Sequence, residues 1–173
     1  MFEFKPISSE SVSKALEKAV RYRLLNEPRE AESICRDVLL ADPNNQKGLV
    51  TLLLALTDQF APEFGGYLDE PRKLLPQLED DYERAYYEGI VLERWGKAQL
   101  AQNRPQNVIQ DWLRQAMTCY ATAETIRPEG NDDAILRWNA CVRVLNNTST
   151  TIDNTPTPNT QALDGLDDEV PIL

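Results

Sequence analysis

The chain has 173 residues with 18 Lys plus Arg and 28 Asp plus Glu, which gives a formal net charge of −10 at pH 7. It contains no histidine, so imidazole-based catalytic triads are excluded and the commonest transition-metal ligand is missing. The acidic balance disfavours nucleic acid as a partner, because binding a duplex needs a surplus of Lys and Arg.

The sequence also disfavours a membrane or secretory role. The longest apolar stretch, Leu49 to Leu56, is too short to cross a bilayer, and the N-terminus lacks the apolar core of a signal peptide. The three cysteines are an odd number at wide spacing, which does not make a full disulfide framework. We therefore expect a soluble, cytoplasmic protein with no membrane partner.

The composition changes sharply after Leu145. Residues 146–173 are rich in Thr, Asn, Asp and Pro and include five acidic residues but no Lys or Arg. Such a segment buries too little apolar surface to offset the entropy lost on ordering. The sequence therefore predicts a folded domain at 1–145 and a disordered acidic tail at 146–173.

Within the domain, apolar residues recur with a period of 3.6, which predicts helices. Pro28 suits the first turn of a helix, whereas Pro76 removes a backbone donor from a short one. Apolar stripes at 12–20, 31–39 and 49–60 are followed by expected helices at 70–77, 81–102, 105–126 and 131–145. Because no segment alternates convincingly with period two, we expect an all-α fold.

One residue spacing occurs twice in the chain, each time ahead of a proline. Counting back twelve, eight and five residues gives Ala31, Cys35 and Val38 before Pro43, and Ala116, Tyr120 and Ala123 before Pro128. With Ala19 and Tyr22 added, residues 12–45 resemble a tetratricopeptide repeat, a 34-residue helix–turn–helix unit. The resemblance implies an α-solenoid, a right-handed superhelix of about two and a half divergent repeats with a capping helix at 131–145.

The same resemblance implies a binding groove lined by the first helix of each repeat. The corresponding positions are Leu16, Val20 and Arg23; Lys47, Val50, Leu54 and Asp58; and Tyr86, Ile90, Glu93 and Arg94. An apolar strip with a charged rim is typical of a surface that binds a peptide or a helix. We therefore expect a non-catalytic adaptor, regulator or assembly factor whose partner is a protein or peptide.

Two other uses of this strip stay open. A solenoid this small can close and bury the strip as ordinary core, or the strip can form the interface of a homodimer.

The Lys and Asn clamp of the chaperone-binding branch of the family is missing, because those positions hold Leu16, Val20, Val50 and Leu54. The C-terminal residues Val170, Ile172 and Leu173 are a further candidate occupant, with Arg23 and Arg94 facing the acids before them.

An enzyme using carboxylates or a thiol is the less favoured alternative. The acidic runs at 79–83 and 132–133 stand at expected helix starts, where carboxylates favour the helix dipole. Cys35, Cys119 and Cys141 lie on apolar faces at separations that match no zinc-ligand spacing. We expect no catalytic site, no metal and no cofactor.

Overall fold

A computed structural model describes residues 2–61 and 65–150, with side chains through residue 147. All regular elements in these ranges are helical, and no strand occurs among them. The α-helices are α1 (Val12–Leu24), α2 (Pro28–Ala41), α3 (Gln46–Asp58), α4 (Asp69–Arg72), α5 (Asp81–Ala101), α6 (Gln106–Ile126) and α7 (Asp133–Thr150). Two 3₁₀ turns, η1 (Ser9–Ser11) and η2 (Leu75–Gln77), complete the elements, so the all-α prediction is confirmed.

Local chemistry explains where these helices begin and turn. The side chains of Asn45 and Asp80 each accept a hydrogen bond, at 2.8 Å, from a backbone N–H three residues later and so cap α3 and α5. Asn26 and Asn103 have φ values of 60° and 54°, the left-handed conformation that asparagine tolerates. They turn the chain between α1 and α2 and between α5 and α6.

Two predicted boundaries differ from the structure. The single helix expected at 70–77 is divided into α4 and η2, because an α-helix continued through Pro76 would clash with the carbonyl of Arg72. The domain boundary expected at Leu145 falls inside α7, which continues to Thr150. The rest of the predicted disordered tail, residues 151–173, lies outside the described residues.

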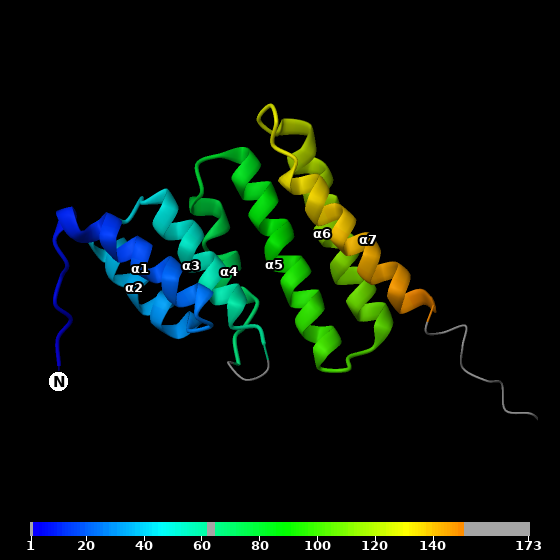
Figure 1. The fold of residues 1–173 in the computed structure, drawn as a ribbon, viewed down its shortest axis with the longest axis horizontal. Helices are drawn as coiled ribbons and strands as arrows, with labels where there is room; N and C mark the ends of the chain where they lie inside the picture. Colours follow the sequence, from blue (N-terminus) through cyan, green and yellow to red (C-terminus); the bar gives the residue numbers. More distant parts are fainter. Residues whose placement is uncertain (1, 62–64, 151–173) are drawn as a thin grey trace, which may run out of the picture.

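The helices follow one another across the molecule in chain order, from α1 to α7 (Figure 1). Helix α1 packs against α2, α5 against α6, and α6 against α7. Helix α3 contacts both α1 and α5, so these three odd-numbered helices lie in succession. In the described part of the chain, no helix is both long enough and apolar enough to span a bilayer.

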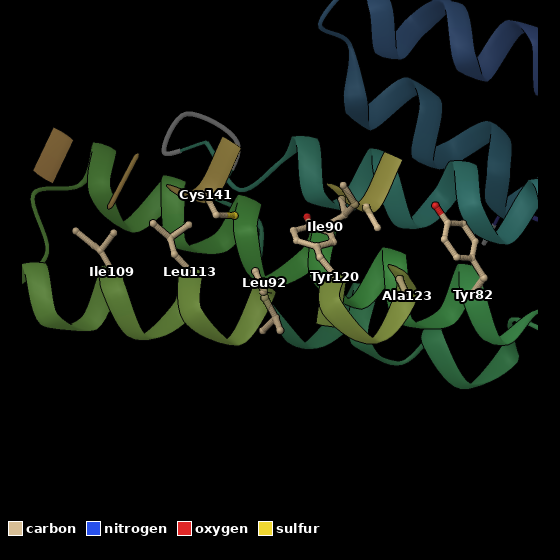
Figure 2. Packing of buried hydrophobic residues seen from close by; sticks show 10 residues of the cluster. Tyr82, Ile90, Leu92, Ile109, Leu113, Tyr120, Ala123 and Cys141 are labelled. Atoms are coloured by element: carbon tan, nitrogen blue, oxygen red, sulfur yellow. The ribbon is translucent and has the colours of Figure 1, made fainter. Parts of the chain in front are cut away.

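Small residues allow the paired helices to approach closely. Ala19, Ala31, Ala116 and Ala123 are fully buried at these contacts. On α6, Ile109, Leu113 and Tyr120 project from the same side of the helix into the core shared with α5 and α7 (Figure 2). The expected small-residue positions therefore do lie where the helices pack together.

Candidate functional site

A groove of about 710 Å³ lies where α1, α3 and α5 meet. Its volume is within the range of about 300–1,000 Å³ typical of ligand-binding clefts. The lining residues come from all three helices: Ser13, Leu16, Glu17, Val20, Gln46, Lys47, Val50, Thr51, Glu83 and Tyr87. Four of them, Leu16, Val20, Lys47 and Val50, were expected from the sequence to line a groove.

Helical geometry explains why these side chains converge. Leu16 and Val20 on α1, and Glu83 and Tyr87 on α5, are each four residues apart and therefore project from one face of their helix. Val50 on α3 lies among them. The apolar side chains form the floor and walls, and Val20 is left 41% exposed.

Helix α5 presents a different face to the groove from the one expected. Glu83 and Tyr87 line it, whereas Ile90 and Glu93 are only 2% and 1% exposed. Tyr86 packs against the core between α5, α6 and α7. The expectation that Tyr86, Ile90 and Glu93 line the groove is therefore wrong. The groove residue on this part of α5 is Tyr87, one position after the expected Tyr86.

Arg23, Asp58 and Arg94 form a triad joining α1, α3 and α5. Arg23 Nε donates a 2.6 Å hydrogen bond to Asp58 Oδ2, and Arg94 pairs with the other oxygen of the same carboxylate. Arg94 also donates to Thr57 Oγ1 at 2.8 Å. Here the structure brings three expected groove residues together, but as an ion-pair cluster between helices. The remaining one, Leu54, is half-buried and packs in the core.

Glu93 belongs to a second, buried ionic cluster. Tyr120 Oη donates a 2.6 Å hydrogen bond to Glu93 Oε2, and Lys97 pairs with the other oxygen. Arg137 of α7 lies 3.6 Å from that same oxygen. Burial, reinforced by the charge of Glu93, raises the pKa of the Tyr120 phenol. Because Glu93 is shielded from solvent, the cluster links α5, α6 and α7 inside the core and its carboxylate is closed to a substrate.

The cysteines are poor nucleophiles in this fold. Burial raises the pKa of the Cys35 and Cys141 thiols to about 12 and that of Cys119 to about 11. All three are therefore protonated at neutral pH, and a thiol is far less reactive than a thiolate. Among the described residues, no group of three or more Cys, Asp or Glu side chains is placed to hold a metal ion.

A second hollow, of about 800 Å³, lies along α2 on another face of the molecule. Two of its charged residues are paired: Arg36 donates to Glu32 and to Glu70, and Glu32 also accepts from Gln59. In the groove between α1, α3 and α5, by contrast, no ion pair joins Glu17, Lys47 or Glu83 to another described residue. The charged side chains of that groove are therefore available to pair with a ligand, whereas Arg36 and Glu32 of the second hollow already pair with each other.

No family model, curated protein or solved structure matches this chain, so the similarity to tetratricopeptide repeats depends on the quoted residues alone.

Proposed function

We propose that this protein is a non-catalytic interaction module that binds a peptide or helix of another protein in the groove between α1, α3 and α5. One observation carries the proposal: Leu16, Val20, Val50 and Tyr87 form an apolar surface that no described side chain covers completely. Charged side chains border this surface on all three helices. An apolar centre with a polar rim is the usual anatomy of a protein interface.

The proposal includes a tetratricopeptide-like arrangement and a cytoplasmic location. The succession of α1, α3 and α5, each followed by a partner segment, supports the arrangement. In such an arrangement a ligand segment buries apolar side chains along the first helices, and the rim charges set its orientation and association rate.

A random 12-residue peptide display selection on the full chain tests the proposal. The double variant Leu16→Gln/Val20→Gln removes the apolar wall of α1 without changing the net charge. Its matched control is Leu24→Gln/Leu25→Gln, which alters two exposed leucines outside the groove, at the end of the same helix. We expect selected peptides to bind the wild type and the control but to lose at least about tenfold in affinity for the groove variant.

Two outcomes would contradict the proposal. One is a selection whose peptides bind the groove variant as tightly as the control. The other is a concentration-dependent dimer, measured by sedimentation, that dissociates only in the groove variant, because the groove would then be a homodimer interface.

A further inference from the structure

We infer that the groove between α1, α3 and α5 accepts a cationic segment, one that places a Lys or Arg side chain between Glu17 and Glu83 and an apolar side chain beside Val20 and Val50. This inference depends on the proposed function and adds the chemistry of the ligand. It is carried by the charges that line the groove.

The groove has two carboxylates against one cation. Glu17 belongs to α1 and Glu83 to α5, so the two acids stand on opposite walls, while Lys47 belongs to α3. Within the described ranges, no ion pair neutralises either carboxylate. A ligand cation in the groove would thus find an unpaired carboxylate on each of two helices.

Glu83 has the greater need for a cation. Burial, together with the nearby charge of Asp80, raises the pKa of its carboxyl. Both effects penalise the ionised form, and a cation bound beside it would relieve the penalty. The apolar walls also lower the local dielectric, which strengthens attraction between a bound cation and these acids.

The two nearby arginines do not reverse this preference. Arg23 and Arg94 share the Asp58 carboxylate, so most of their charge is already paired inside the molecule. The acidic C-terminal segment at 146–173 has no Lys or Arg to offer to Glu17 and Glu83. The acidic residues of that segment would be repelled by Glu17 and Glu83, so the occupant that we infer is a cationic segment of another protein.

The amino-acid composition of the display-selected peptides is the first test. We expect Lys and Arg to be enriched next to apolar residues, and synthetic copies in which Lys and Arg become Gln to bind about tenfold more weakly. Raising the salt concentration from about 50 to 500 mM should weaken the cationic peptides, because screening shortens the reach of the carboxylates.

A pair of variants separates the groove from the general acidity of the chain. Glu17→Gln/Glu83→Gln and Glu30→Gln/Glu124→Gln change the net charge equally, but Glu30 and Glu124 are exposed on α2 and α6, outside the groove. We expect only the first variant to lose the preference for cationic peptides over their Gln copies. Loss in both variants, or in neither, would overturn the inference.

These results are distinguishable from failure of the proposed function. Peptides that require Leu16 and Val20 but are neutral or acidic would overturn the inference and leave a peptide-binding groove in place. Peptides that are insensitive to Leu16→Gln/Val20→Gln would contradict the proposed function itself.

Discussion

Gly89 of α5 faces the ring of Tyr120 of α6 so closely that a Cβ atom at Gly89 would lie 2.5 Å from Tyr120 Cε1. Both residues are buried, and Tyr120 is held in place by its hydrogen bond to Glu93. The ring therefore has no room to retreat. This contact fixes the spacing between α5, which lines the groove, and α6.

Gly89→Ala should destabilise the protein despite the better helix propensity of alanine. Alanine gains about 1 kcal/mol over glycine in a helix, but overpacking a rigid core typically costs about 1–3 kcal/mol. We expect a net loss of up to about 2 kcal/mol in the free energy of unfolding, measured by urea denaturation. Adding Tyr120→Leu should recover part of that loss in a double-mutant cycle, and strictly additive effects would show that the contact is not responsible.

Tyr120→Phe should destabilise the protein more than Tyr82→Phe. Tyr120 donates to the buried carboxylate of Glu93, whereas Tyr82 donates to the neutral side chain of Asn131 at 3.1 Å. Losing a hydrogen bond to a buried charge costs about 1.5–3 kcal/mol, against about 1 kcal/mol for a neutral pair. Thermal or urea unfolding of the two variants measures this difference, and equal losses would contradict a special role for Glu93.

The groove shows what sequence periodicity can and cannot predict. On α1 and α3 the repeat spacing counted from Pro43 gave the correct register, so Leu16, Val20, Lys47 and Val50 were found. On α5 the periodicity is weak, because three consecutive residues, 90–92, are all buried between two sets of neighbours. A helix buried on two sides has no single apolar stripe from which to read its register.

Glu93 illustrates a second limit. A charged residue is expected at the surface, and Glu93 is buried where several partners, most of them on other helices, meet its carboxylate. Its partners Tyr120 and Arg137 lie 27 and 44 positions away in the chain, on other helices. The one local partner, Lys97, is four residues away, a spacing that is also common on exposed helix faces and therefore does not signal burial, so the sequence placed Glu93 in the groove.

Stability should fall as the pH rises above about 9. The folded-state pKa of Cys35 and Cys141 is raised by burial to about 12, above the usual value of 9.0 that applies to the unfolded chain. A raised pKa means that the folded state retains its proton while the unfolded state loses it, so this stability is present below pH 9 and is lost as the pH rises toward 12.

Urea denaturation between pH 8 and 10.5 measures the effect. The free energy of unfolding of the wild type should decline with pH, and the decline should be shallower in Cys35→Ala, whatever its absolute stability. The half-buried Tyr87, whose pKa is also raised by burial to about 12, contributes to the slope that remains. Identical slopes in the two proteins would show that Cys35 ionises equally in both states.

Asp58→Asn should weaken the junction of α1, α3 and α5. The substitution removes the carboxylate that Arg23 and Arg94 share, so both ion pairs are lost. The two guanidinium groups are then left close together and repel each other. Because these side chains are partly exposed, we expect the free energy of unfolding to fall by about 1–2 kcal/mol at low salt and by less at high salt.

Asp111→Asn is the matched control. Asp111 pairs with Arg114 on the exposed face of α6, where a salt bridge contributes about 0–1 kcal/mol. Urea midpoints of the two variants at two salt concentrations give the comparison, and a loss at Asp58 no larger than at Asp111 would mean that the triad does not hold the three helices together.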